Sequence, residues 1–475
     1  MRTVFKACFV AGLMSPVWVM ASQDLSAPGA FQAGWMDVTV NRPAGSSFTA
    51  KLFYPAVSSG QNAPYDGTSA PYAGISFGHG FLQTVEKYQS TLDHLATWGY
   101  FVIASRSGGE LLPNHQAFAD DLRHCLTYLE QGNLDNGSWL YGQVQTARFG
   151  MSGHSMGGGA SLLATAADSR VRTVANLAAA DTNPSAIDAA GLLAVPVCLI
   201  TGSEDTIVPP QNHGQLMYNA APPPRQLPLI VGGYHCGFID SNSIFCDSGS
   251  ISRAAQLAIT RRLLTGWFNL YLKSDQTVWP LVWGEPVLAD PAVSTTLDSG
   301  IVLTSSPDAF VGVRGSELTG TLTIHNAGQR ASRYSAFVED NQWPVAIMPN
   351  QTSLLGPGQA ETVNLSLTVP ADAASVFDQP LVSVRCGADE ATRAFVRLRV
   401  DLTTAADFDR DCDVDLADFQ AFEECASGPA IPLASSCQFA DLDADGDVDQ
   451  SDFGLFQRCY SGEAGIADPY CIQGL

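Results

Sequence analysis

The chain carries a serine, an aspartate and a histidine in an order that suits nucleophilic catalysis. Ser155 lies within GHSMGG, Asp205 follows the apolar run VCLITGSE, and His235 follows QLPLIVGGY. A serine hydroxyl becomes a useful nucleophile when a histidine takes its proton and a carboxylate holds that histidine in the correct tautomer. We therefore predict Ser155 as nucleophile, His235 as general base and Asp205 as the acid that orients the base.

The residues around Ser155 fit the turn on which a nucleophilic serine is presented. The run ARFGM before it reads as a buried strand and GGGASLLATAA after it reads as a helix, with Gly153 and Gly157 beside the serine. A sharp strand-to-helix turn leaves no room for side chains, and the helix N-terminus favours developing negative charge. The order serine, acid, histidine along the chain is that of α/β hydrolases.

The acid and base roles each have other candidates. Asp181 follows the run VANLAAA, and Glu204 directly precedes Asp205. We prefer Asp205 and His235 because each begins a loop just past an apolar strand, where these groups stand in this fold. Four further histidines are predicted not to be the base: His79, His115, His154 and His213.

An oxyanion formed at the scissile carbonyl needs two backbone N–H groups. One should belong to the residue after the nucleophile, Met156, and the other to the loop after an early strand. The segment ISFGHGF is that strand and loop, so we assign the second donor to Phe81. No metal or cofactor is needed for this chemistry.

Residues 22–290 alternate continuous apolar runs with helix-like stretches. Because such runs, separated by helices, indicate a parallel sheet covered on both faces, we predict an α/β domain of the α/β-hydrolase fold. The expected strands are YAGISFGHG, YFVIASR, ARFGMSGHS, RTVANLAAA, PVCLITGSE and QLPLIVGGYH; the expected helices include QSTLDHLATWG, AFADDLRHCLTYLEQG and GGGASLLATAADS.

Residues 300–401 change to short alternating strands such as GTLTIHNAG, ETVNLSLTVP and RAFVRLRV, with turns like GPGQ. This pattern predicts a β-sandwich of immunoglobulin size. It resembles, in a general way, the immunoglobulin-like accessory modules of secreted bacterial enzymes.

The C-terminal segment 405–475 is acidic and internally repeated. Of the net charge of −23, 14 negative charges lie in this segment, which argues against nucleic-acid binding and favours cations. DFDRDCDVDLADFQAFEECASG recurs 34 residues later as DLDADGDVDQSDFGLFQRCYSG, and each acidic loop precedes an amphipathic helix, so a small α-helical module is expected. Alternating oxygen ligands predict one structural Ca²⁺ in each loop. The candidate ligands are Asp407, Asp409, Asp411, Asp413 (through its carbonyl), Asp415 and Asp418, then Asp441, Asp443, Asp445, Asp447 (through its carbonyl), Asp449 and Asp452.

The N-terminus predicts export. Residues 1–21 combine basic residues, an apolar stretch and small residues at Val19 and Ala21, which indicates a secretory signal peptide. A membrane anchor is the alternative, disfavoured because Pro16 interrupts a short apolar run. No other stretch is long enough to span a bilayer. Secretion permits disulfides, and Cys236 with Cys246 could close a short loop, whereas the pairing of the C-terminal cysteines stays open.

The motifs GHGFLQTVEKYQSTLDHLATWGYFVIA, GMSGHSMGGGASL, GSEDTIVPP and GGYHCGF resemble those of secreted cutinases and poly(ethylene terephthalate)-hydrolase-like esterases, and of the related chlorophyllase and dienelactone-hydrolase branches, over about residues 30–272. The resemblance implies the same triad and oxyanion residues, with His154 beside the substrate. These families usually carry a tryptophan on the loop after the next strand, but here AAADTNPSA has no aromatic residue. We therefore expect small or aliphatic esters as substrates. No lid insertion is evident in the sequence, so we do not favour a true lipase.

The repeated module, over about residues 405–462, resembles type I dockerins. That resemblance implies a cohesin-like partner, bound through paired residues late in each loop. Here those are Leu416-Ala417 and Gln450-Ser451, which depart from the common Ser-Thr type. A cohesin partner is therefore one hypothesis, and a calcium-stabilised attachment tail is the other. The protein is expected outside the bacterial cell, either attached to its surface or released.

Three functions remain open on the sequence. The first is a secreted serine carboxylic ester hydrolase acting on polyesters or short-chain esters. The second is a carbohydrate esterase that removes acetyl or feruloyl groups and is attached through its dockerin-like module. The third is a non-catalytic, calcium-dependent binding protein that kept the fold.

Overall fold

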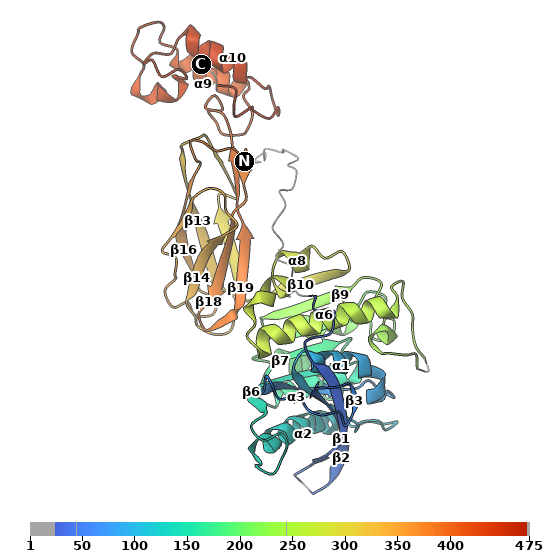
Figure 1. Cartoon of the computed structure of the whole chain (residues 1–475). Coiled ribbons are helices and arrows are strands. Elements are labelled where there is room, and N and C mark those ends of the chain that lie inside the picture. The colour runs from blue at the N-terminus through green and yellow to red at the C-terminus, as the bar shows by residue number, and fades with distance from the viewer. Residues whose placement is uncertain (1–23, 44, 244, 473–475) are drawn as a thin grey trace. The chain divides into compact units, whose positions relative to one another are not determined.

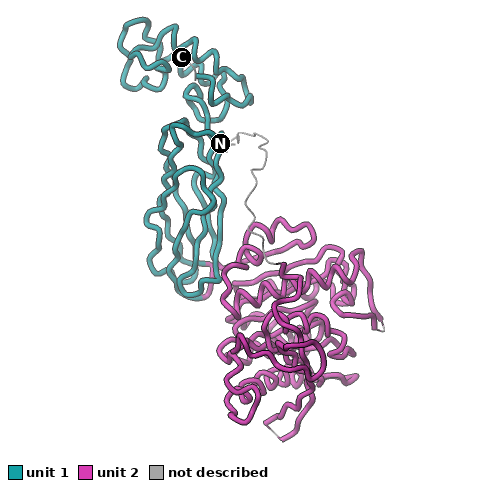
Figure 2. The backbone as a smooth tube through the Cα atoms, viewed as in Figure 1, with its two compact units in different colours: residues 1–20, 301–326, 330–475 teal, residues 21–300, 327–329 magenta. Residues whose placement is uncertain are grey.

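The computed structural model describes residues 24–43, 45–243 and 245–472. The predicted signal peptide, residues 1–21, lies outside the described residues. Contacts divide the described chain into two compact units (Figure 2). The first unit along the chain, magenta and labelled unit 2 in Figure 2, runs to Gly300 and includes Ala327–Gln329. The second along the chain, teal and labelled unit 1, contains Ile301–Asn326 and the described residues from Arg330 onward.

The first unit is built on one ten-stranded sheet with the order β10-β9-β8-β7-β6-β4-β5-β2-β1-β3. Its six central strands, in the order β9-β8-β7-β6-β4-β5, run parallel. The strand β2 joins β5, β1 joins β2 and β10 joins β9 in antiparallel pairs. The strands are β1 (Gln32–Asn41), β2 (Ser47–Ala56), β3 (Gly60–Gln61), β4 (Tyr72–Gly78), β5 (Tyr100–Ser105), β6 (Val144–His154), β7 (Val171–Leu177), β8 (Val197–Gly202), β9 (Arg225–Ile230) and β10 (Val293–Asp298).

Helices cover both faces of this sheet, which explains why β4, β5 and β8 are buried along their whole length. The helices α1 (Gln89–Thr97) and α6 (Arg253–Leu272) pack together, and Figure 1 shows them on the same side of the sheet. A second layer consists of four helices, each of which packs against the next along the chain: α2 (His115–Leu134), α3 (Met156–Ala166), α4 (Ala186–Gly191) and α5 (Gly214–Ala220). Short helices complete the unit: η1 (Val85–Tyr88), η2 (Pro210–Asn212), η3 (His235–Phe238), η4 (Gln276–Val278), α7 (Trp279–Val282) and α8 (Glu285–Leu288).

The second unit begins with mostly antiparallel sheets around an apolar core that includes Trp343, Leu365 and Val384; the pair β12 with β20 is parallel. One sheet has the order β11-β13-β16-β15, a second β14-β18-β19, and a third β12-β20-β17. The strands are β11 (Ile301–Ser306), β12 (Ala309–Gly312), β13 (Glu317–Asn326), β14 (Tyr334–Glu339), β15 (Val345–Met348), β16 (Ala360–Thr368), β17 (Phe377–Asp378), β18 (Leu381–Cys386), β19 (Asp389–Arg397) and β20 (Arg399–Leu402).

The sequence repeat is a repeat in space. Helices α9 (Leu416–Cys425) and α10 (Gln450–Cys459) each follow one acidic loop, and η5 (Ser435–Ala440) lies between the repeats. Core residues recur 34 positions apart, as in the pairs Val414 with Val448 and Phe422 with Phe456. The disulfides Cys425–Cys437 and Cys459–Cys471 follow the same spacing, so each repeat carries its own covalent link.

The predicted fold class is confirmed: a mostly parallel α/β-hydrolase sheet, then antiparallel β-sheets, then a helical segment with aspartate clusters. Cys236–Cys246 forms the disulfide that its spacing suggested. Among the described residues, no helix combines the length and the apolar character needed to cross a membrane.

Candidate active site

Ser155 occupies the turn between β6 and α3. Its backbone has φ 55° and ψ −121°, a left-handed conformation that a serine adopts only when its surroundings require it. The Ser155 amide donates to Leu177 O at 3.0 Å, and its carbonyl accepts from Gly159 and Ala180 at 3.1 and 3.0 Å. These three bonds hold the strained residue between β7 and the first turn of α3.

Glycines allow the close packing around this turn. A Cβ on Gly157 would lie 2.1 Å from Gly78 O, and one on Gly153 would lie 2.3 Å from Gly157 O. Since no real Cβ approaches a carbonyl oxygen so closely, strand ends β4 and β6 can meet α3 only through bare backbone. The glycines of GHSMGG are thus a packing requirement of the elbow.

The structure brings His235 and Asp205 together. His235 begins η3 after β9, Asp205 follows β8, and His235 Nδ1 lies 2.8 Å from Asp205 Oδ2. The other oxygen, Asp205 Oδ1, accepts from the amides of Ile207 and Val208 at 2.9 and 2.7 Å. Both side chains are buried. With Nδ1 donating to the carboxylate, the neutral imidazole presents Nε2 as a proton acceptor.

The described residues include no hydrogen bond between Ser155 Oγ and His235 Nε2. Ser155 is 8% exposed, so its hydroxyl lies at the edge of solvent. Catalytic hydrogen bonds in an unliganded protein are often long and tighten when the substrate binds.

The rival acids have other partners. Asp181 Oδ1 accepts from Ser185 Oγ and from the amides of Ala186 and Ile187, which caps the start of α4. Glu204 accepts from the amide and the hydroxyl of Ser250, both at 2.7 Å. Neither carboxylate contacts His235, so Asp205 is the acid that the geometry favours.

The other histidines are engaged in the framework. His79 bonds to Gly80 O and Ser107 O, at 2.9 and 2.8 Å, and so ties the loop before Phe81 to the loop after β5. His115 Nδ1 accepts from the Asn183 amide at 3.1 Å. His213 Nδ1 accepts from the Asp181 amide at 3.0 Å.

His154 is buried against Tyr88, whose hydroxyl lies 2.8 Å from His154 Nδ1. The same hydroxyl accepts from the Gly80 amide at 2.9 Å. Burial, and then the neighbouring His235, hold the pKa of His154 well below its usual range. The residue predicted beside the substrate is therefore neutral, and through Tyr88 it is linked to the loop that carries Phe81.

A cleft of about 290 Å³ opens beside Ser155. It brings together Ser155 and both predicted oxyanion residues, Phe81 and Met156. Met156 is the first residue of α3, where amides have no partner within the helix. The full lining is Phe81, Leu111, Pro113, His115, Ser155, Met156, Ala180, Asp181 and Thr182.

Two contributors were missed at the level of sequence. Leu111, which is 77% exposed, supplies an apolar wall from the loop after β5. Asp247 accepts hydrogen bonds from the backbone of both triad loops. Its position next to Cys246 was the available signal, since that cysteine pairs with Cys236 beside His235.

The acidic loops gather carboxylates as candidate metal ligands. In the first repeat, Asp418 forms clusters with Asp407 and Asp409 and with Asp413 and Asp415, their oxygens within 4.8 Å of one another. The second repeat forms the matching clusters around Asp452: Asp441 and Asp443, and Asp447 and Asp449. Asp413 and Asp447 thus offer side-chain oxygens, where a carbonyl was expected.

The remaining predicted ligands, Asp411 and Asp445, bond to the amides of Asp413 and Asp447 at 3.1 and 3.2 Å, and the described residues do not place them in the clusters. Burial raises the pKa of Asp418 to about 6, and neighbouring carboxylates add to this. All these donors are oxygen atoms, the ligands that Ca²⁺ prefers, and Asp447 Oδ1 is buried without a partner in the described part of the chain. The residues fit a calcium ion in each loop.

Comparison with known proteins supports the α/β-hydrolase prediction for the first unit. Residues 28–252 match the family described as PETase, PET hydrolase-like, whose activity is ester hydrolysis. No curated protein matches the chain. The segment 28–252 is thus similar to PET hydrolase-like enzymes, and the sheet that contains it has the fold of an α/β hydrolase.

Proposed function

We propose that this chain is a secreted serine ester hydrolase that works through an acyl-enzyme. The observation that carries the proposal is the 2.8 Å contact between His235 Nδ1 and Asp205 Oδ2, in the same unit as a strained serine elbow. An oriented base and a serine hydroxyl that lines a cleft are the two parts that acyl transfer needs.

In the proposed mechanism, Ser155 Oγ attacks the ester carbonyl carbon while His235 Nε2 takes the hydroxyl proton. The imidazolium is stabilised by Asp205, and the oxyanion accepts hydrogen bonds from the amides of Phe81 and Met156. The alcohol leaves with the proton from His235, which yields the acyl-Ser155 intermediate. A water molecule, deprotonated by His235, then attacks the acyl group, and the acid is released as Ser155 regains its proton.

The cleft favours aliphatic esters. Leu111, Pro113, Phe81 and Met156 provide apolar walls, and the loop after β7 contributes Ala180, Asp181 and Thr182 in place of an aromatic side chain. We propose short-chain or aliphatic polyester substrates.

The test compares release of soluble products from an aliphatic polyester film, hydrolysis of a soluble butyrate ester, and the same assays on Ser155→Ala. We expect both substrates to be cleaved and Ser155→Ala to be inactive while its unfolding temperature stays unchanged. Cleavage of the soluble ester alone would restrict the substrate to small esters. Inactivity on both would favour the non-catalytic binding protein.

A second candidate is a carbohydrate esterase, which removes acyl groups from plant polymers. The paired aspartate clusters favour it, because a dockerin-like module suits an enzyme attached to others at a polysaccharide. Release of acetate from acetylated xylan, at a rate above that on the butyrate ester, is the result expected of this candidate.

We also propose that the C-terminal repeats form a dockerin-like module with two structural Ca²⁺ sites. The two clusters of each loop share one carboxylate, Asp418 in the first repeat and Asp452 in the second, so we expect one ion per repeat. Calorimetric titration of the calcium-stripped chain should give two sites, and Asp452→Ala should reduce them to one. Asp468→Ala is the matched control, since Asp468 bonds to the Tyr470 amide outside the clusters.

A further inference from the structure

Asp247 joins the two loops that carry the proposed acid and base. Its Oδ2 accepts from the His235 amide at 2.9 Å and from the Thr206 amide at 3.3 Å, and its Oδ1 accepts from the Cys236 amide at 2.9 Å. Thr206 directly follows Asp205. One carboxylate therefore bonds to the backbone of His235 itself and to the backbone next to its partner acid.

Covalent chemistry reinforces the same place. The disulfide Cys236–Cys246 joins the residue after His235 to the residue before Asp247. The hydrogen bonds of Asp247 and the disulfide thus join the same two short segments, residues 235–236 and 246–247. Both kinds of bond restrain the backbone at His235.

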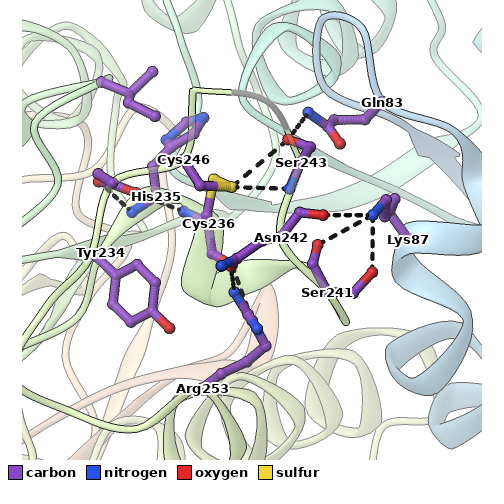
Figure 3. The surroundings of a disulfide bond; sticks show 12 residues. Gln83, Lys87, Tyr234, His235, Cys236, Ser241, Asn242, Ser243, Cys246 and Arg253 are labelled. Carbon is purple, nitrogen blue, oxygen red and sulfur yellow. Dashed lines mark hydrogen bonds between the residues drawn. A yellow bond between two sulfur atoms is a disulfide. The ribbon is translucent and has the colours of Figure 1, made fainter.

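The same loop is anchored to the segment that follows Phe81 (Figure 3). Lys87 Nζ donates to Ser241 O, Ser241 Oγ and Asn242 O at 3.3, 2.8 and 2.8 Å. Gln83 Nε2 donates to Ser243 Oγ at 2.9 Å. Asp247 is consequently connected to a framework that extends to the oxyanion side of the cleft.

We propose that Asp247 is a positioning residue for the triad: by bonding the His235 and Thr206 amides, it fixes the approach of His235 to Asp205. This rests on the proposed function, because it assigns a role within that site. Bonds from backbone amides to a carboxylate are about twice as strong as those to a neutral acceptor, which suits an element that must hold a geometry.

The test measures kcat and KM on a soluble butyrate ester for Asp247→Ala and Asp247→Asn. Asp247→Ala should lower kcat by ~10–100-fold, the scale expected when a catalytic group is displaced by about 1 Å. KM should stay within about twofold, because Asp247 does not line the cleft. Asp247→Asn should be intermediate, because its amide oxygen can accept from His235 and Thr206 while the bond to Cys236 is lost.

Glu204→Ala is the matched control. It removes a carboxylate one residue from Asp205 that also bonds two groups of a neighbouring loop, but none belonging to His235. Its kcat should equal that of the wild type. Equal losses in Glu204→Ala and Asp247→Ala would overturn the proposal, because general loosening of the loops would then explain both. Wild-type kcat in Asp247→Ala would overturn it as well.

A spectroscopic measurement separates this proposal from the proposed function. The His235 Nδ1 proton, bonded to Asp205, should give a downfield NMR resonance that His235→Gln removes. We expect Asp247→Ala to shift or broaden it, Asp247→Asn to do so less, and Glu204→Ala to leave it in place. If the wild type cleaves no ester but these changes appear, the positioning role stands and the proposed function fails. An unchanged resonance in a folded Asp247→Ala would overturn the positioning role even in an active enzyme.

Discussion

The rings of His154 and His235 lie with their centroids 4.4 Å apart, tilted by 42°. Two positively charged histidine rings this close would repel each other. Burial, and then the neighbouring His235, hold the pKa of His154 well below its usual range. Of the two rings, only His235 has a carboxylate partner, so the pair is asymmetric: His154 is held neutral, whereas His235 is oriented by Asp205.

The first prediction concerns the pH dependence of hydrolysis. Since a lowered pKa keeps His154 neutral from weakly acidic pH upward, His154 should add no second ionisation to the acid limb of kcat/KM. A plot of log kcat/KM against pH should have a limiting slope of one. A slope of two, reduced to one in His154→Gln, would show that both rings titrate.

Stability should fall below neutral pH because of His94. This buried side chain bonds to Leu25 O and Thr265 Oγ1 at 3.1 and 3.0 Å, and burial lowers its pKa from 6.5 to about 4. The unfolded chain therefore takes up the proton first, so the contribution is complete above pH 6.5 and is lost as pH falls towards 4. Between pH 7 and 5 the loss should be about 2 kcal/mol.

Urea unfolding of the wild type and of His94→Gln at both pH values isolates this contribution. The free energy of unfolding of His94→Gln should depend on pH less than that of the wild type by this amount. Parallel pH dependence in the two proteins would contradict the assignment.

Loss of the disulfide beside the base should affect stability and catalysis together. Replacing Cys236 and Cys246 by alanine opens a loop with a sequence separation of 10, which corresponds to about 3 kcal/mol of unfolding free energy. We expect a lower unfolding temperature and a kcat that falls further below wild type as temperature rises. The control replaces Cys425 and Cys437, whose separation is 12 and which lie in the other unit; its kcat should not change.

Calcium removal should act on the second unit alone. A chelator leaves the buried carboxylates around Asp418 and Asp452 without a counter-charge, so the unfolding transition of this unit should move to lower temperature. Hydrolysis of a soluble ester should be unaffected, because the triad lies in the first unit. Scanning calorimetry with and without excess Ca²⁺ measures the first effect, and an unchanged transition would count against the calcium sites.

The elbow should not tolerate a single methyl group. In Gly157→Ala the new Cβ would meet Gly78 O at 2.1 Å and His79 O at 2.6 Å. Relief of that clash should lower the free energy of unfolding by about 1–3 kcal/mol and kcat/KM by at least ~10-fold. Gly109→Ala is the control, because its Cβ would meet no atom within 4 Å, and both quantities should stay close to wild type.

The sequence predicted the structure best where a pattern of residues has a single physical explanation. Continuous apolar runs predicted the parallel strands β4 to β9, and a 34-residue repeat predicted two matched acidic loops. The antiparallel additions β1, β2 and β10 were not predicted. In β1 and in the edge strand β10, buried positions are mixed with exposed ones, so neither carries a continuous apolar run. Asp247 was missed for a different reason. A carboxylate that bonds to backbone amides of distant loops leaves no pattern among its partners, because every residue except proline supplies the same amide; the one indirect signal was the neighbouring Cys246.

The interlocked glycines of the elbow determine where this candidate site can diversify. Backbone that touches backbone at Gly78, Gly153 and Gly157 admits no other residue, so neither natural drift nor laboratory selection can reshape the site from that side. Other walls of the cleft come from the loops that supply Leu111 and Thr182, which line it with side chains. New ester preferences should therefore arise in those two loops, and mutant libraries are best built there.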